Sequence, residues 1–267
     1  MESGFAPSEI DTTRAHPARM YDYYLGGKDN YAVDQEAARE VIRVAPEVRD
    51  MARANRAFLQ RAVRFLAGES GIRQFLDIGT GIPTAGNVHE VAGEVAPEAR
   101  VVYVDNDPIV NTHANALLSG SGATGIVLAD VRDPAAILNH PTTRALLDFG
   151  EPIALLLLAV LHFVTDDEKP ADIVAVLRDA LPPGSYLALS HVTKDFRSQA
   201  AEAAAAVYNQ ATSTVTLRSH LVISSFFDGF KLVEPGLVQL PLWRPDGPLP
   251  RNLDKIWFYG GVARLAD

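Results

Sequence analysis

Short apolar runs alternate with amphipathic segments through most of the chain, and turn residues separate them. Strands that alternate with helical patterns predict a parallel sheet with helices packed on both faces. The last two runs are joined by a Pro-rich turn and not by a helix, so we expect them to pair antiparallel. The expected strands lie at 75–78, 100–105, 125–129, 152–158, 185–190, 231–240 and 255–264.

The N-terminal part of the chain shows a different pattern. Residues 1–18 have no apolar periodicity and predict a loose arm. Residues 34–67 have helical periodicity with a break at Pro46, which predicts two helices.

A Tyr-rich segment lies between this arm and these helices. Four tyrosines surround the pair Gly26 and Gly27. The segment either ends a helix at the glycines and packs on the domain, or closes over a ligand through Tyr21 and Tyr24.

A glycine-rich turn follows the first apolar run. The run ends in Asp77, and Gly79, Thr80 and Gly81 come directly after it. A strand that breaks into Gly-x-Gly before a helical pattern is typical of a nucleotide-binding turn, because glycine lets the backbone pass close to a ligand. Pro83 suits the first turn of the helix that we expect next.

The charge of Asp77 favours one ligand class over another. A dinucleotide fingerprint needs a third glycine at position 84, where the chain has Thr84, and it places a pyrophosphate that Asp77 would repel. S-adenosyl-L-methionine has no phosphate but carries a cationic sulfonium and an ammonium group, and a carboxylate attracts both. We therefore expect S-adenosyl-L-methionine as the cofactor.

The end of the second run supports a nucleoside ligand. Asp105 lies 24 residues after Gly81, near the spacing at which a carboxylate binds ribose hydroxyls. Asn106 adjoins it, and we count both residues as cofactor contacts. Asp107 precedes Pro108 and is more simply a helix cap.

The second N-terminal helix carries a polar residue on its apolar side. Asn55 falls between Met51 and Phe58, and because a buried amide needs partners, it either ties helices together or reaches the ligand. The other face carries arginines. This face is most simply exposed to solvent, and the alternative is that it binds a carboxylate. The arginines are Arg49, Arg53, Arg56 and Arg64.

Two histidines are candidate bases. In a doubly wound sheet the first and fourth strands flank the ligand crevice, so Leu158 and Ala159 at the end of the fourth run should face the reacting group. His162 follows them, and His191 follows the fifth run. Each histidine is either a catalytic group or a packed, hydrogen-bonded residue.

The acidic residues Asp77, Asp105 and Asp130, together with the closing pair of strands, resemble a class I methyltransferase from about residue 70 onward. Pro83 departs from the usual third glycine of that family's first motif. The resemblance implies that Asp130 accepts a hydrogen bond from the adenine amino group and that the backbone of Val131 meets a ring nitrogen.

Three further segments resemble a bacterial family of candidate S-adenosylmethionine-dependent methyltransferases, long classed as a domain of unknown function. They are 11–30, 54–59 and 226–230. The resemblance implies an α/β fold: a Rossmann-like class I methyltransferase sheet of seven strands, the last two antiparallel, with helices on both faces and an N-terminal helical extension. We expect an N-terminal arm and helical lid at 1–68 and the Rossmann-like domain at 69–267.

Composition narrows the class of protein. The chain of 267 residues has a net charge of −9 with dispersed basic residues, so we expect no general nucleic-acid binding. It contains no cysteine, which excludes disulfides and thiolate metal sites, and no other cluster has metal-ligand spacing. The longest apolar run, 153–161, is too short to cross a bilayer, and we expect a cytoplasmic protein. The sequence does not define an oligomeric state.

These observations give one main hypothesis and two alternatives. The main hypothesis is methyl transfer from S-adenosylmethionine to an unidentified small molecule, with His162 or His191 as an optional base. A non-catalytic sensor of the same ligand is the first alternative. A nucleotide-dependent oxidoreductase is the second, although Asp77 disfavours it.

Overall fold

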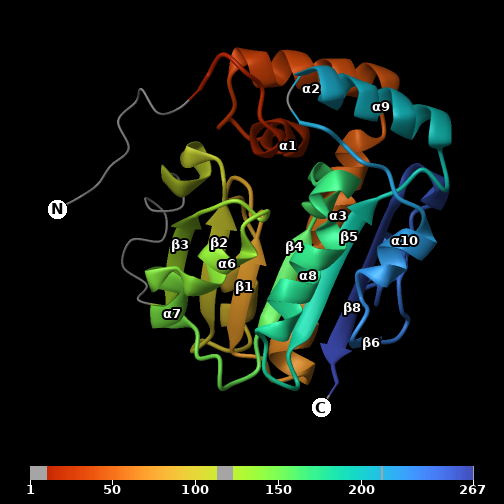
Figure 1. Cartoon of the computed structure of the whole chain (residues 1–267). Helices are drawn as coiled ribbons and strands as arrows, with labels where there is room; N and C mark the ends of the chain where they lie inside the picture. Colours follow the sequence, from red (N-terminus) through yellow and green to blue (C-terminus); the bar gives the residue numbers. More distant parts are fainter. Residues whose placement is uncertain (1–10, 113–122, 212, 267) are drawn as a thin grey trace.

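One mixed sheet forms the centre of this computed structural model, which describes residues 11–112, 123–211 and 213–266 (Figure 1). Its strands are β1 (Gln74–Ile78), β2 (Arg100–Asp105), β3 (Thr124–Leu128), β4 (Ala154–Leu158), β5 (Tyr186–Val192), β6 (Phe230–Leu232), β7 (Val238–Gln239) and β8 (Phe258–Leu265). Within the described residues the order is β3-β2-β1-β4-β5-β8-β6, and β7 also pairs with β8. β1 to β5 are parallel, and β8 is antiparallel to β5, β6 and β7.

The predicted α/β sheet with an antiparallel end is confirmed, with one difference in its strands. The segment 231–240, expected as one strand, forms the separate strands β6 and β7. A turn between them contains Pro235, which has no N–H to donate to the ladder, and the Gly236 N–H bonds to the Val233 carbonyl instead. The described part of the sheet therefore has eight strands and not seven.

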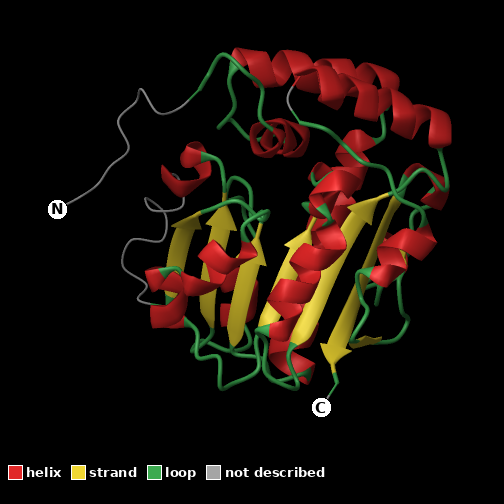
Figure 2. Ribbon diagram, viewed as in Figure 1, coloured by secondary structure: helices red, strands yellow, loops and turns green. Residues whose placement is uncertain are grey.

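Helices cover both faces of the sheet (Figure 2). They are α1 (Pro17–Leu25), α2 (Ala32–Val44), α3 (Val48–Arg64), α4 (Val88–Gly93), α6 (Pro134–Asn139), α7 (Pro141–Leu146), α8 (Pro170–Asp179), α9 (Ser198–Ala211) and α10 (His220–Ser225), with short turns η2 (Phe65–Glu69), η3 (Leu161–Phe163), η4 (Asp166–Glu168), η5 (Leu240–Leu242) and η6 (Leu253–Lys255). Successive strand residues enter two cores: Leu156 packs with α1 to α3, whereas Leu155 and Leu157 pack with α8. This alternation is expected of strands buried on both faces.

The N-terminal helices lie over the edge where the parallel strands end (Figure 1). α1, α2 and α9 cross that edge, and α2 packs against α9 from the far end of the chain. The helices of residues 1–68 share a core with one face of the sheet. The division at residues 68/69 stays a prediction, and residues 1–10 of the expected arm lie outside the described residues.

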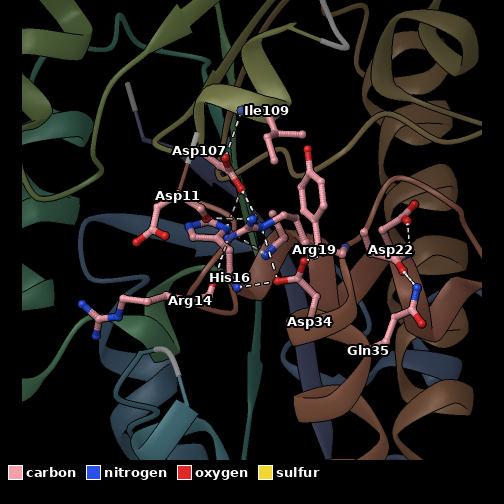
Figure 3. Close-up of polar contacts among 12 residues, drawn as sticks. Asp11, Arg14, His16, Arg19, Asp22, Asp34, Gln35, Asp107 and Ile109 are labelled. Carbon is pink, nitrogen blue, oxygen red and sulfur yellow. Dashed lines mark hydrogen bonds and ion pairs between the residues drawn. The ribbon is translucent and has the colours of Figure 1, made fainter. Parts of the chain in front are cut away.

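Buried charges attach this layer to the sheet (Figure 3). Arg19 of α1 lies between Asp34 of α2 and Asp107 after β2, with its Nε 3.4 Å from Asp34 Oδ1 and 3.5 Å from Asp107 Oδ2. The His16 backbone N–H donates to Asp34 Oδ1 at 2.9 Å, and His16 Nδ1 lies 3.0 Å from Asp107 Oδ2. Arg19, Asp34 and Asp107 are each at most 4 % exposed, so these charges depend on one another for stabilisation.

The Tyr-rich segment shows features of both interpretations. Gly26 ends α1 with a φ of 85°, as the helix-end interpretation requires. At Gly27 a Cβ atom would overlap the Asp22 carboxylate, which accepts bonds from the Asp29 N–H and the Asn30 side chain. Tyr21 and Tyr24 nevertheless face the cavity described below.

The helix after the glycine turn begins later than predicted. α4 starts at Val88 and not near Pro83. Asn87 accepts a hydrogen bond from the N3 backbone, and the Glu90 carboxylate accepts one from the Asn87 N–H. This capping box fixes the helix start and leaves residues 82–87 as a loop beside the turn. The cap predicted at Asp107 is confirmed, because its Oδ1 accepts from the Ile109 N–H.

Candidate active site

A cavity lies at the carboxyl ends of the parallel strands, beneath the N-terminal helices and α9. A crevice at this edge, between β1 and β4, is where open α/β sheets bind ligands. Its lining includes every residue that the sequence predicted as a cofactor contact. They are Tyr21, Tyr24, Asn55, Asp77, Gly79, Thr80, Gly81, Asp105, Asn106, Asp130, Val131, Leu158 and Ala159.

The cavity has two parts of different chemistry. We call the strand-end half the lining residues at the ends of β1, β2 and β3 and in the loops after them, with His16 and Arg56. We call the helical half the lining residues of α2, α9, η3 and segment 213–217, with Val192, Trp257, Phe258 and Tyr24.

The glycine turn brings the backbone into the strand-end half. Gly79 and Gly81 have φ values of 77° and 69°, a region that other residues rarely adopt. A Cβ at Gly79 would lie 2.6 Å from Val160, whereas a Cβ at Gly81 would meet no atom of the described residues within 4 Å. Gly79 is therefore needed for packing, and Gly81 faces open space that a ligand can occupy.

Asp77 is a buried carboxylate, and no cationic side chain among the described residues is in direct contact with it. It is 4 % exposed, and its Oδ2 accepts a hydrogen bond from Thr80 Oγ1 at 2.9 Å. Burial raises the pKa of Asp77 to about 6, against the opposing effects of the Thr80 bond and the Arg56 charge. A cation bound beside it would relieve this cost, so the residue fits the sulfonium and ammonium groups of S-adenosylmethionine.

Asp105 holds the glycine turn and still has acceptor capacity. Its Oδ2 accepts from the Gly81 N–H at 2.8 Å, and its Oδ1 accepts from the Asp107 N–H at 2.9 Å. Burial raises its pKa. A carboxylate offers about four acceptor sites, so two remain for a pair of ribose hydroxyls.

Asp130 lies in a more exposed and more cationic setting. Its oxygens accept from the Asn106 side chain at 3.0 Å and from the Arg132 N–H at 2.9 Å, and the Arg132 guanidinium lies 3.1 Å away. Burial alone would raise the pKa of Asp130, but these hydrogen bonds and the charge lower it. Asp130 therefore stays ionised as a hydrogen-bond acceptor at this end of the cavity.

A chain of hydrogen bonds joins the Tyr-rich segment to the end of β4. The Tyr21 hydroxyl donates to the Ala52 carbonyl at 3.0 Å and accepts from Asn55 Nδ2 at 3.1 Å. Ser190 Oγ donates to Asn55 Oδ1 at 2.7 Å and accepts from the Ala159 N–H at 2.9 Å. Ala159 has a φ of 57°, a strained value that this bond helps to hold. Asn55 thus ties α3 to α1 through Tyr21, which is one of its two predicted roles, and it also ties α3 to β5 through Ser190.

His162 lines the helical half, and one of its ring nitrogens is buried without a partner. The residue is 5 % exposed, and its Nδ1 has no hydrogen-bond partner among the described residues. Burial lowers the pKa of His162 well below its ordinary value, so the ring is neutral at pH 7. A buried polar atom without a partner is costly unless a ligand supplies one.

The structure does not bring His191 to the cavity. Its Nδ1 donates to the Val192 carbonyl at 2.6 Å, and its Nε2 accepts from Arg218 Nη1 at 3.0 Å. β5 runs to Val192 and not to Ser190 as predicted, and because strand residues alternate, His191 points away from Ser190 and toward Phe226. Burial lowers its pKa to about 3. Its position therefore does not support a role as a base.

Sequence reasoning missed several lining residues. Arg56 faces the cavity and donates to the Gly86 carbonyl at 3.1 Å, whereas Arg64 pairs with Asp246 outside it. His16, Arg132 and most of the helical half were also missed. The only sequence signal for Arg56 was its place on the arginine face of α3, where neighbours look the same.

The described residues contain neither a candidate metal site nor a candidate membrane span. Across 11–112, 123–211 and 213–266, no group of three or more His, Asp or Glu side chains is placed to hold a metal ion. In the same ranges no helix combines the length and the apolar character needed to span a membrane.

Comparison with known proteins places the chain in a family. A structure of a DUF574 family protein from Streptomyces avermitilis is similar over 96 % of this chain and 99 % of its own, with 48 % identity and a TM-score of 0.93. A candidate methyltransferase from Thermobifida fusca has 41 % identity and a TM-score of 0.92, with 99 % and 100 % of the two chains covered.

More distant structures share the fold alone. The N-methyltransferase NodS from Bradyrhizobium japonicum, in complex with S-adenosyl-L-homocysteine, has 15 % identity and a TM-score of 0.51, over 87 % of this chain and 98 % of its own. No curated protein matches the chain. The sequence profile of the S-adenosyl methyltransferase family matches residues 3–266. The chain therefore belongs to the S-adenosyl methyltransferase family, and its cofactor is S-adenosylmethionine.

Proposed function

We propose that this protein transfers the methyl group of S-adenosylmethionine to a small molecule that binds in the helical half of the cavity. The observation that carries the proposal is the buried carboxylate of Asp77, which lies beside a glycine turn open to a ligand and has no cationic partner in direct contact within the part of the chain that the structure describes. A cofactor with a cationic sulfur suits that position, whereas a pyrophosphate does not.

Each cofactor-binding residue has a distinct role in this proposal. Asp77 attracts the cationic methionine end, and Arg56, whose charge acts on Asp77, binds the carboxylate of the same end. Asp105 accepts from the ribose hydroxyls, with Asn106 beside it. Asp130 and the backbone of Val131 bind the adenine ring.

The chain's own residues mainly align the reacting groups and exclude water. The cofactor supplies a methyl group that is already activated by its positive sulfur, so orientation accounts for much of the rate. Tyr21 and Tyr24 close the cavity from α1, and the hydrogen bonds through Asn55 and Ser190 fix the end of β4. His162 receives a hydrogen bond from the acceptor and holds its nucleophilic atom in place.

Calorimetry and isotope transfer test this function. We expect S-adenosylmethionine to bind the purified protein, and an absence of heat at millimolar ligand would refute the proposal. Cofactor labelled in its methyl group should then transfer the label to a small molecule of a cell extract. Binding without any transfer would instead favour a sensor.

Replacement of Asp105 tests the ribose contact. Asp105→Asn keeps the size of the side chain but loses the charge, so the affinity for S-adenosylmethionine should fall by about 1.5–3 kcal/mol. Asp133→Asn is the matched control, since Asp133 only caps α6. Equal affinities of the two variants would show that the assignment of Asp105 is wrong.

A further inference from the structure

A run of aromatic rings forms one wall of the helical half. The hydroxyls of Tyr24 and Tyr208 lie 3.0 Å apart, and the ring of Tyr208 lies 5.8 Å from that of Phe163. The ring centroids of Phe163 and His162 lie 4.4 Å apart, and those of His162 and Phe258 lie 5.9 Å apart. This wall favours a flat, apolar ligand, because rings pack well on ring edges and faces.

Small side chains beside Tyr208 on α9 leave space in the helical half. Ala201, Ala204 and Ala205 of α9 line the cavity, and each is at most 8 % exposed. Longer side chains on this face of α9 would fill the helical half of the cavity.

The helical half contains no ionised side chain among its described lining residues. The Asp and Arg residues that line the cavity all belong to the strand-end half. Burial raises the pKa of Tyr208 to about 12, so this hydroxyl is also neutral at pH 7. A charged acceptor would lose its hydration here without gaining a partner of opposite charge.

One buried side-chain atom among the described lining residues of this half has no hydrogen-bond partner. The two tyrosine hydroxyls bond to each other, whereas His162 Nδ1 has no partner in the described chain. This nitrogen lies after β4, on the side where the cofactor's methyl end is proposed. It is therefore placed to bind one O–H or N–H group next to the methyl.

From this geometry we infer that the acceptor is an uncharged aromatic molecule with one hydroxyl or amine, which donates a hydrogen bond to His162 Nδ1. The inference rests on the proposed methyltransferase function and names its acceptor class. His162 is a hydrogen-bond acceptor in this arrangement, and the rings around it hold the apolar body of the acceptor.

A matched set of naphthalene derivatives tests the acceptor class. The protein, saturated with S-adenosylhomocysteine, is titrated at pH 7 with 2-naphthol, naphthalene, naphthalene-2-sulfonate and 2-naphthylmethylammonium, and binding is followed by ligand-detected NMR. We expect 2-naphthol to bind at least about tenfold more tightly than both charged compounds and about fivefold more tightly than naphthalene. Equal or tighter binding of either charged compound would overturn the inference.

Replacement of His162 tests the named contact. In His162→Phe the fivefold advantage of 2-naphthol over naphthalene should disappear, while naphthalene itself binds as before. His220→Phe is the control, because His220 lies outside the cavity lining and bonds to the Leu237 carbonyl. The melting temperature of His162→Phe should not fall, since the change removes an unpartnered buried atom. A hydroxyl advantage that persists in this variant would overturn the assignment.

The order of the titrations separates two kinds of failure. If S-adenosylhomocysteine itself does not bind, the methyltransferase proposal fails, and the acceptor inference fails with it. If it binds and the naphthalene compounds show no preference for the neutral hydroxyl, only the acceptor inference fails.

Discussion

The two halves of the cavity are stabilised by different physical means. In the strand-end half, charged and backbone groups hold one another: Asp105 accepts from two backbone N–H groups, and the nearby Arg19 lies between two buried carboxylates. In the helical half, apolar packing and a neutral tyrosine pair serve that purpose. Removal of one group from a buried charge network leaves its partner charge uncompensated and strongly reduces stability, whereas a packed apolar surface can repack around a substitution. We therefore expect substitutions near the strand-end half to reduce the free energy of unfolding more than substitutions in the helical half do.

Removal of Arg19 should have the largest effect. Arg19→Met leaves Asp34 and Asp107 without their cation and also removes hydrogen bonds to the carbonyls of Asp11 and Arg14. We expect the free energy of unfolding in urea to fall by about 3–5 kcal/mol. Arg53→Met, which breaks an exposed pair with Asp50, should cost about 1 kcal/mol or less. Similar losses in both variants would contradict the importance of the buried cluster.

The second largest losses of unfolding free energy should come from alanine substitution at the two glycines of the turn. The two losses should differ in size. Gly79→Ala combines left-handed backbone strain of about 1–2 kcal/mol with overlap against Val160, for a total of about 2–4 kcal/mol. Gly81→Ala adds only the strain, about 1–2 kcal/mol, because its Cβ would enter open space. Urea unfolding measures both losses.

Cofactor affinity should rank these glycine variants differently. A methyl group at Gly81 would occupy space that the cofactor needs. Gly81→Ala should therefore bind S-adenosylmethionine more weakly than Gly79→Ala does, although Gly81→Ala is expected to be the more stable of the two variants. If Gly81→Ala binds normally, the cofactor does not approach this part of the turn.

The strand-end half could be predicted because its chemistry follows from local sequence. Asp77 and Asp105 lie at the ends of apolar runs and Asp130 lies just after one, and parallel strands bring such positions to one edge. The start of α4 was predicted wrongly, although Asn87 and Glu90 have capping-box spacing that marks it.

Apart from Tyr24 and His162, the helical half could not be predicted, because its contacts are distant in sequence. Tyr24 and Tyr208 are 184 residues apart, and the Ala-rich α9 carries no signal of a binding surface. The contrast between His162 and His191 was equally hidden. Two more residues of β5 turned His191 to the opposite face, and strand ends are uncertain by about that much when read from sequence.

The pH dependence of cofactor binding is a third test of the strand-end half. Because burial raises the pKa of Asp77 to about 6, only about a tenth of the carboxyls are ionised at pH 5. A bound cation needs the ionised form, so affinity for S-adenosylmethionine should rise about tenfold between pH 5 and pH 7. Calorimetry at several pH values measures this rise, which should be absent in Asp77→Asn.

The stability of the cofactor-free protein should change with pH in the direction opposite to that of the cofactor affinity. The folded pKa of Asp77 lies above its unfolded value of 3.8, so the stability it contributes is full below pH 3.8 and is lost as pH rises through about 6. Asp77→Asn removes this loss, and the free variant should gain stability relative to wild type as the pH increases from 5 to 7. A parallel pH profile for the two proteins would show that Asp77 is not desolvated.

The tyrosine pair of the helical half should give the smallest effect. Tyr208→Phe leaves the buried Tyr24 hydroxyl without its partner and should cost about 1 kcal/mol of unfolding free energy. Once one hydroxyl is gone, removal of the other costs little, so the double change to Phe should cost less than the sum of the single changes by about 0.5–1 kcal/mol. A double-mutant cycle measured by urea unfolding gives this coupling. A coupling as large as the loss in Arg19→Met would mean that the helical half also depends on polar contacts, and the difference between the two halves would not hold.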